Sequence, residues 1–323
     1  MNSKHITVRN HFNDLLVGME REHGTRDTCI QFLEALQAAL RATAFKGGGD
    51  LRRQFEDFYD LFAPLKPRMA IIQHYLDVLI EHLDENPRAD AGGLIEEMIA
   101  AIHDARADNA AQNAKLLKEA VKLIPSCGRV LVHSHSRTVL DTLDLARRTH
   151  KKFEVIVAEQ ETARTLDVVR FLQERDIRFI VVPEYMLSSL EVDISCLLIG
   201  AVTLKHDMHF VVDAGTKAVV SEMRLAKIPV QLMLTTNKFS YWNTRKASQT
   251  VKTIKSIAHP HADFCFDRVK FSHDRLPLDL VDRIVTEEGG FPPDRMREVY
   301  RRKLADYRAL HARLALRHDG ADR

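Results

Sequence analysis

The spacing of hydrophobic residues changes at Pro125, and this change constrains the fold more than any other feature of the sequence. Before Pro125, apolar residues recur every three or four positions, which is the period of an α-helix with one buried face. Such a stripe is formed by Ile30, Leu33, Leu36 and Leu40. The same spacing predicts further helices over residues 51–62, 68–83 and from 94 to 124.

After Pro125, short β-branched runs alternate with helical stretches. Strands are predicted over residues 129–133, 153–158, 178–182, 196–200 and 229–235. Continuous apolar strands separated by helices are typical of a parallel sheet covered on both faces. The predicted fold class is therefore α/β, with an N-terminal helical domain (residues 1–125) and a C-terminal Rossmann-like parallel-sheet domain (residues 126–323).

The overall charge and the cysteines narrow the class of protein. Lys and Arg total 47 against 45 Asp and Glu, so no general nucleic-acid surface is expected, and the basic run at 295–303 is interpreted as a solvated helix face. Four widely spaced cysteines without a CxxC pair argue against a zinc knuckle or disulfide framework. With no secretion signal in residues 1–20 and no membrane-length apolar run, we expect a cytoplasmic protein with no membrane partner.

One loop directly after the first predicted strand has the composition of an anion site. It consists of His133, Ser134, His135, Ser136 and Arg137. A helix N-terminus presents unpaired N–H groups that suit a phosphate, and two hydroxyls and a guanidinium add donors. The alternative is a capped turn with Ser136 as the N-cap. Two histidines two positions apart also resemble metal ligands, but no acidic or cysteine partner stands at ligand spacing, so no metal is predicted.

Four further residues are expected at the same edge of the sheet, since parallel strands end together there. Glu159 ends the second strand and could hold a ribose hydroxyl; Gly215 and Thr216 open a helix that could cradle an anion; Lys238 follows the strand at 229–235. Each also has a plain alternative as a solvated loop residue. Together they predict binding of a phosphorylated sugar or a nucleotide monophosphate. No GxGxxG follows a strand, so no dinucleotide or other cofactor is predicted.

The order of these motifs resembles that of the alpha, beta and delta subunits of translation initiation factor 2B. The stretch LVHSHSRTVL at 131–140 is similar to the strand, loop and helix of the alpha subunits, and AEQE, IGAV, DAGT and LTTNKF follow in the family's order. The resemblance covers Arg129 to Gly290. It implies a regulatory subunit that assembles as a homodimer or with related subunits.

The same superfamily contains methylthioribose-1-phosphate and ribose-1,5-bisphosphate isomerases, which use a cysteine and an aspartate to convert an aldose to a ketose phosphate. The resemblance places Ser134 at the cysteine position and Val202 at the aspartate position. It also places Glu161 where these enzymes have a substrate-binding arginine, and Val212 and Asp213 at their asparagine–lysine pair. Because valine cannot move a proton, and losing one positioned acid or base costs about 10²–10⁴ in rate, we expect no isomerase activity.

Three interpretations remain open. The first is an initiation factor 2B-related regulatory protein that binds its ligand without catalysis. The second is a sugar-phosphate isomerase with a divergent active site built from His133, His135, or His206 with Asp207. The third is an interaction protein with a pocket that binds nothing. Ser134 and Val202 speak against the second, whereas the retained Lys238 and Gly215–Thr216 speak against the third.

The assembly predicted from the resemblance is a homodimer formed through the α/β domain. Apolar residues near the chain end, beyond the last clear strand, support it: Phe264, Phe266, Val269 and Phe271. The alternative is that these residues form an additional strand of the core.

Overall fold

The computed structural model describes residues 3–62, 69–85, 91–242, 252–258 and 265–321. Its N-terminal part is helical, as the apolar spacing predicts. The helices are α1 (Ser3–Ala42), α2 (Gly48–Phe62), α3 (Ala70–Glu85) and α4 (Ala91–Ala120). Arg68, predicted to begin the third helix, lies outside the described residues. One core joins the four helices, with Leu33, Phe55, Tyr75 and Met98 almost fully buried in it.

A seven-stranded sheet follows, in the order β13-β12-β7-β4-β1-β2-β3. All neighbouring strands are parallel except the edge pair β12 and β13. The strands are β1 (Gly128–Val132), β2 (Phe153–Glu159), β3 (Phe179–Pro183), β4 (Cys196–Gly200), β7 (Val230–Met233), β12 (Arg283–Thr286) and β13 (Gly289–Phe291). The five predicted strands correspond to β1, β2, β3, β4 and β7, and the α/β fold class with a helical N-terminal region is confirmed.

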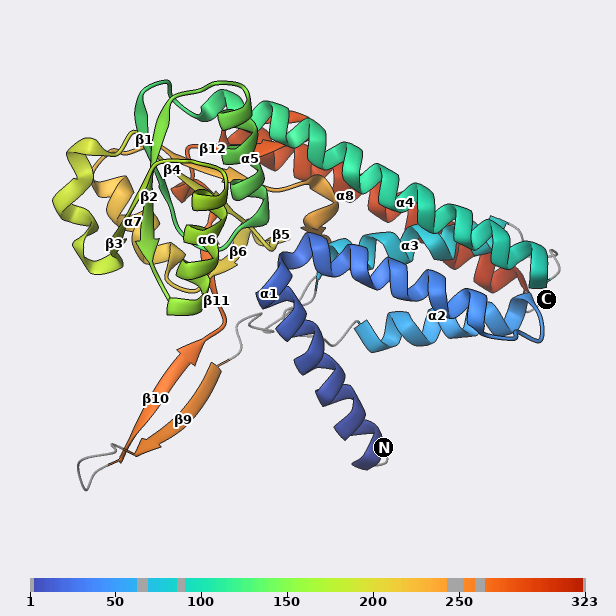
Figure 1. Cartoon of the computed structure of the whole chain (residues 1–323). Helices are drawn as coiled ribbons and strands as arrows, with labels where there is room; N and C mark the ends of the chain where they lie inside the picture. Colours follow the sequence, from blue (N-terminus) through green and yellow to red (C-terminus); the bar gives the residue numbers. More distant parts are fainter. Residues whose placement is uncertain (1–2, 63–68, 86–90, 243–251, 259–264, 322–323) are drawn as a thin grey trace.

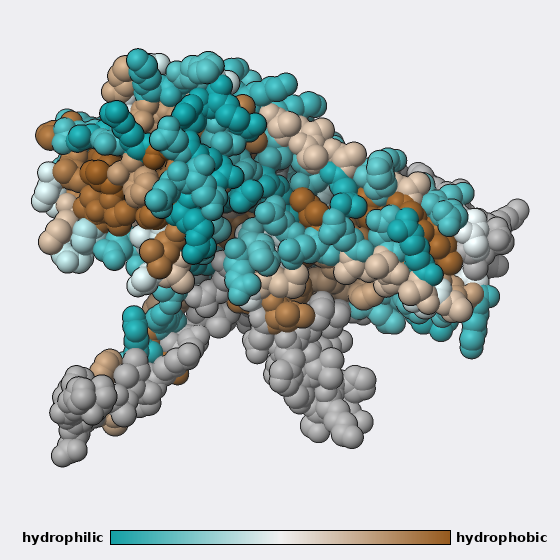
Figure 2. All heavy atoms as spheres, in the orientation of Figure 1, coloured by the Kyte–Doolittle hydropathy of each residue, from teal (hydrophilic) through white to brown (hydrophobic). Residues whose placement is uncertain are grey.

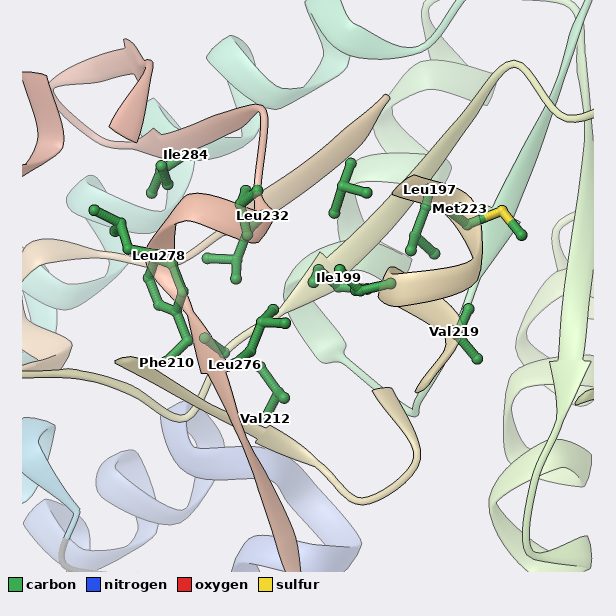
Figure 3. Packing of buried hydrophobic residues seen from close by; sticks show 14 of the residues in the cluster. Leu197, Ile199, Phe210, Val212, Val219, Met223, Leu232, Leu276, Leu278 and Ile284 are labelled. Carbon is green, nitrogen blue, oxygen red and sulfur yellow. The ribbon is translucent and has the colours of Figure 1, made fainter. Parts of the chain in front are cut away.

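Helices cover both faces of this sheet (Figure 1). On one face lie α5 (Arg137–Arg148), α6 (Thr162–Glu174) and the end of α4, over residues such as Val130 and Val155. The other face packs against α7 (Thr216–Leu225) and the start of α8 (Pro293–Ala321). Figure 3 shows this second core, where Leu197 and Ile199 of β4 meet Val219 and Met223 of α7. Two buried faces explain why the central strand β4 carries no polar or charged side chain.

Several elements were not predicted from the sequence. A small sheet, in the order β11-β6-β5-β8, contains β5 (Thr203–Lys205), β6 (His209–Asp213), β8 (Phe239–Ser240) and β11 (His273–Pro277). A separate antiparallel ribbon, β9 (Lys252–Ala258) and β10 (Cys265–Phe271), projects from the body of the molecule (Figure 1). Phe266, Val269 and Phe271 are about half exposed on the ribbon, so the alternative of an additional core strand is wrong for them. Phe264 lies outside the described residues.

Helix α8 runs back from the sheet and packs against α3 (Figure 1). Its His311 is 3.4 Å from Asp77 of α3. The basic run of α8 is paired on the helix surface: Arg297 contacts Asp279 at 2.6 Å, and Lys303 contacts Glu288 at 2.7 Å. Among the described helices, none is long and apolar enough to cross a membrane.

The described residues also form four 3-10 helices. They are η1 (Val121–Leu123), η2 (Glu184–Asp193), η3 (Thr236–Lys238) and η4 (Leu278–Leu280). Of these, η1 links α4 to β1, and η3 follows β7 directly and contacts α3 of the helical region. Helix η3 therefore ties the end of the sheet to the helices and carries Lys238.

Candidate ligand-binding site

A pocket that is open to solvent lies where the strand order of the sheet reverses. Strand β1 has β2 and β3 on one side and β4 on the other, so the loops after β1 and β4 leave in opposite directions. Open parallel sheets bind ligands at this point, outside the carboxyl ends of the strands. The pocket is lined by Glu20, Gly24, Thr25, Arg26, Ser134, His135, Ser136, Arg137, Thr138, Arg164, Gly200, Ala201, Val202, Val212, Asp213 and Lys238.

The loop after β1 forms one wall of the pocket in a tightly constrained conformation. Ser134 has φ +81°, a left-handed conformation that non-glycine residues rarely adopt and that is common at functional sites. Ser136 is the N-cap residue of α5, but its hydroxyl makes no capping hydrogen bond. A Cβ atom at Gly200 would lie 2.0 Å from Ser136 Oγ, so glycine is required for β4 to end against this loop. The first N–H groups of α5 thus open on the pocket without a side-chain cap.

Two arginines share one carboxylate beside this loop. Asp141 of α5 lies 3.0 Å from Arg26 Nη2 and 3.2 Å from Arg137 Nε. Arg26 also contacts Asp27, yet its buried Nη1 atom has no hydrogen-bond partner. A buried guanidinium donor without an acceptor is costly, so a ligand oxygen at this position would be stabilised.

Lys238 is buried at the inner end of the pocket. Its backbone is fixed by Thr203, whose hydroxyl donates to the Lys238 carbonyl at 2.6 Å. Its Nζ donates to the Ala201 carbonyl at 3.4 Å. Burial, followed by repulsion from Arg26, lowers the pKa of Lys238 to about 8. With a pKa of about 8, roughly a fifth of the Lys238 population is therefore a neutral amine at physiological pH.

The acidic side of the pocket contains Glu20 and Asp213. Glu20 Oε2 is buried without a hydrogen-bond partner and lies 3.6 Å from His273 Nε2. Burial would raise the pKa of Asp213, but the ion pair with Arg164 at 3.1 Å outweighs it and holds that pKa below its usual value. Asp213 therefore stays ionised, with Arg164 as its partner.

Of the nine predicted binding residues, five line the pocket: Ser134, His135, Ser136, Arg137 and Lys238. Burial lowers the pKa of His135, so this ring is neutral near pH 7 and adds no charge to the site. The isomerase positions Ser134 and Val202 lie in the same pocket, where Val202 contributes an apolar wall.

The other predicted residues lie outside the lining of the pocket. His133 is buried, 3.0 Å from Thr216 Oγ1 and 2.7 Å from the Gln160 amide. The backbone N–H groups of Gly215 and Lys217, at the start of α7, both donate to one oxygen of Asp274 at 3.0 Å. The start of α7, which was expected to bind an anion of the ligand, therefore already holds a carboxylate of the chain itself.

Glu159 is exposed at the end of β2. Glu161, on the loop that follows, pairs with Lys270 of the ribbon at 2.9 Å. His206 and Asp207 lie at the turn between β5 and β6, where Asp207 pairs with Arg275. In the part of the chain that the structure describes, no group of three or more His, Cys, Asp or Glu side chains could hold a metal ion.

Sequence reasoning missed the contribution of α1 to the pocket. Glu20, Thr25 and Arg26 flank Gly24, where α1 is interrupted by a non-helical residue with φ +78°. The interruption turns this segment toward the sheet. The signal was a glycine within a helical pattern. The Thr28 hydroxyl donates back to the Gly24 carbonyl at 2.9 Å across this interruption.

A parallel sheet with a pocket at its switch point, together with a helical N-terminal region, defines an α/β protein with a Rossmann-like fold. The chain belongs to the initiation factor 2 subunit family, whose profile matches residues 21–293. A Pyrococcus furiosus protein named as eIF-2B subunit 2-like is 27% identical over 202 residues, which cover 62% of this chain and 68% of that protein.

Two solved structures show the same fold. The translation initiation factor eIF-2B of Pyrococcus horikoshii OT3 has a TM-score of 0.64 at 17% identity, covering 91% of this chain and 99% of its own. A subunit of the tetrameric eIF2B-beta2-delta2 complex from C. thermophilum has a TM-score of 0.66 at 17% identity, covering 90% and 93%. The resemblance inferred from the motifs is thereby confirmed at the level of family and fold.

Proposed function

We propose that this chain is an initiation factor 2B-related regulatory protein of the cytoplasm that binds a phosphorylated sugar or a nucleotide monophosphate without converting it. The observation that carries the proposal is the buried, unpartnered Nη1 of Arg26 in a pocket at the switch point of the sheet. The uncapped start of α5 and the nearby Arg137 add two further elements that favour a phosphate.

The balance of charges favours a ligand with one phosphate. Asp213 is ionised at the pocket wall, and the start of α7 already holds the Asp274 carboxylate. A second phosphate would meet carboxylates at both places. We therefore expect a monophosphate, anchored by Arg26 and the Ser134–Arg137 loop, with its carbon chain toward Lys238. Two contacts remain predictions from the sequence. They are a contact of Glu159 with a ribose hydroxyl and a contact of Gly215 and Thr216 with a phosphate.

The absence of turnover is proposed from the residues that face this ligand. Val202 carries no group that can exchange a proton, and Ser134 is far less acidic than a thiol at the same place. His133 and Asp207, candidates for a divergent isomerase, are engaged inside the fold with Thr216 and Arg275. The isomerase alternative therefore has His135 as its remaining candidate group in the pocket.

Ligand binding is tested by thermal unfolding with ribose 5-phosphate, adenosine monophosphate and inorganic phosphate. Binding to the native state alone stabilises it by about 2.7 kcal/mol at a hundredfold excess over the Kd. We expect a rise in Tm that is lost in Arg137→Ala and Lys238→Ala. Arg170→Ala is the matched control, because Arg170 is exposed on α6 and pairs only with Asp167.

The same mixtures distinguish the alternatives. Proton NMR of the sugar phosphates, including ribose 1,5-bisphosphate and methylthioribose 1-phosphate, should show no ketose product. Conversion at about 1 s⁻¹ or faster would establish the isomerase instead. If calorimetry detects no binding at millimolar concentration, the interaction-protein interpretation replaces the proposal.

A further inference from the structure

Lys238 carries an amine nucleophile, a property that goes beyond its part in non-covalent binding. Its Nζ lines the pocket beside the Val202 wall and is buried with the rest of the side chain. An ammonium ion has three donors to satisfy. Within the described residues, the hydrogen bond recorded for this Nζ is a long one, 3.4 Å to the Ala201 carbonyl. The site is thus poorly built for a charged lysine and well suited to a neutral amine.

Glu20 supplies the second requirement of amine chemistry, which is a group that can carry protons. It lies in the same pocket, and its charge acts on Lys238. One of its oxygens is buried without a hydrogen-bond partner. A carboxylate in that state can accept a proton from a nitrogen and deliver it to an oxygen.

We propose that Lys238 forms a reversible imine with the aldehyde carbon of an open-chain aldose monophosphate bound in this pocket. The inference rests on the proposed function, because the phosphate contacts at Arg26 and the Ser134–Arg137 loop must hold the ligand first. It identifies the ligand as a carbonyl compound and makes its recognition covalent. A nucleotide monophosphate, which has no free aldehyde, would not react in this way.

The reaction balances without any further reagent. The lone pair of the neutral Nζ attacks the carbonyl carbon, a C–N bond forms, and the carbonyl electron pair moves to oxygen. Glu20 takes one proton from the nitrogen and passes it to that oxygen, giving the neutral carbinolamine. The second nitrogen proton follows the same route through Glu20 to the hydroxyl oxygen, the C–O bond breaks, water leaves, and the nitrogen electron pair completes the C=N bond of a neutral imine. Hydrolysis reverses the sequence and restores Lys238.

The pocket also explains why the reaction would stop at the imine. Continued isomerisation would require a base beside the second carbon of the sugar, and the apolar Val202 forms that wall. The bound state is then a covalent but hydrolysable complex, which suits a protein that reports the presence of a metabolite rather than consuming it.

The experiment incubates the full chain with ribose 5-phosphate and sodium cyanoborohydride, which reduces an imine to a stable secondary amine. Intact-mass spectrometry should show one adduct, with the mass of the aldose phosphate less one oxygen atom. Peptide mapping should place it on Lys238. Lys205 is the internal control, since it is also buried but lies on β5, outside the pocket lining.

Ribitol 5-phosphate, which keeps the phosphate and has no aldehyde, separates this inference from the proposed function. It should bind in calorimetry and suppress the adduct at least tenfold. If it binds but ribose 5-phosphate gives no adduct on Lys238, the imine is refuted and the proposed function stands. If neither compound binds, the imine is refuted, and if adenosine monophosphate does not bind either, the proposed function is refuted as well. Equal labelling of Lys205 and Lys238 would also overturn the inference, because it shows that the reaction does not select the lysine in the pocket.

Two different variants of Lys238 test the assignment, so that misfolding of one variant does not decide the result. Lys238→Arg keeps the charge and Lys238→Met keeps the length, and neither can form an imine. Each should lose the adduct completely, provided that far-ultraviolet circular dichroism shows the native helix content. An adduct that persists at full yield in a folded variant places the reaction elsewhere and contradicts the proposal.

Discussion

At the scale of single residues, the buried charges of the pocket decide its behaviour. Asp213 and Lys238 are both withdrawn from water, but they respond in opposite ways. Asp213 has Arg164 at 3.1 Å and stays charged, because the ion pair outweighs the cost of burial. Lys238 has no such partner at contact distance, and burial shifts it toward the neutral form. One pocket therefore contains a permanent ion pair and a titratable amine.

The pKa of Lys238 makes the stability of the protein depend on pH in a defined window. The pKa is about 8 in the folded chain against 10.5 for an unperturbed lysine. Between these values the unfolded state binds one more proton than the folded state, so stability rises as pH rises. At 1.36 kcal/mol per pH unit, the gain is about 3 kcal/mol from pH 8 to pH 10.5.

Urea unfolding of the wild type and of Lys238→Met, at a series of pH values from 7 to 10.5, measures this effect. The difference in free energy of unfolding between the two proteins should stay constant below pH 8 and then move in favour of the wild type. The variant removes the titrating group, so every other pH effect cancels. A difference that does not change with pH would show that Lys238 is charged in the folded protein.

At the scale of elements, the start of α7 shows how an internal carboxylate takes the place of a cap. Asp274 of β11 accepts from the backbone N–H groups of Gly215 and Lys217. Gly215 itself has φ +93°, which only glycine adopts without strain. A negative charge at a helix N-terminus and two hydrogen bonds from N–H donors are both stabilising.

Replacement of Asp274 by asparagine should lower the free energy of unfolding by about 1–2 kcal/mol, because the charge is lost while one weaker acceptor remains. Equilibrium urea unfolding measures the change. Asp279→Asn is the matched control: Asp279 is an exposed partner of Arg297, and such surface pairs contribute about 0–1 kcal/mol. Equal effects of the two substitutions would show that Asp274 is not an effective cap.

The elements that could be predicted from the sequence are those whose pattern is set by burial alone. Strand β4 is apolar throughout because both of its faces are covered, and the helices before Pro125 show one stripe because one face is covered. Strand β5 has three residues, too few to display any period. Strand β11 has the sequence HDRLP and lies at the edge of the small sheet. Its adjacent charged residues obscure the alternation of polar and apolar positions that would indicate a strand.

Within the candidate site, the residues that could be predicted from the sequence are those that directly follow a strand of the parallel sheet. Ser134 and Lys238 each follow a strand of one parallel sheet, so their convergence was foreseeable. Arg26 and Arg164 lie on helices, and their local sequences resemble those around arginines on a protein surface, so they could not be recognised as site residues. Gly215 follows β6, which belongs to the small sheet, so the order of the parallel strands could not place it; β6 itself reaches the pocket through Val212 and Asp213.

At the scale of the whole molecule, exposed apolar surface indicates where a second chain could bind. Figure 2 shows hydrophobic side chains gathered at the end of the α/β region where β3, η2 and α7 lie. Val192 is 96% exposed and Leu225 is 86% exposed, with Tyr185 and Met186 nearby in the chain. Monomeric proteins rarely expose a contiguous patch of this kind, which is typical of an interface.

We expect the protein to be a homodimer formed through this surface of the α/β region. A symmetric dimer would cover the patch of each chain with that of the other, since one self-complementary surface suffices for a two-fold contact. Light scattering coupled to size-exclusion chromatography, at micromolar concentration, should report twice the mass of the 36.9 kDa chain. Leu225→Asp should convert the dimer to a monomer, because it places an unpaired charge within the buried contact.

A matching substitution on the ribbon shows which of the two apolar surfaces forms the interface. Phe271 is 53% exposed on β10, and Phe271→Asp introduces the same charge on a different apolar surface. If the contact lies at β3, η2 and α7, this variant remains a dimer while Leu225→Asp does not. The reverse result would move the interface to the ribbon. A wild-type chain that is monomeric at micromolar concentration would contradict the homodimer itself, since a stable interface of ordinary size should persist at that concentration.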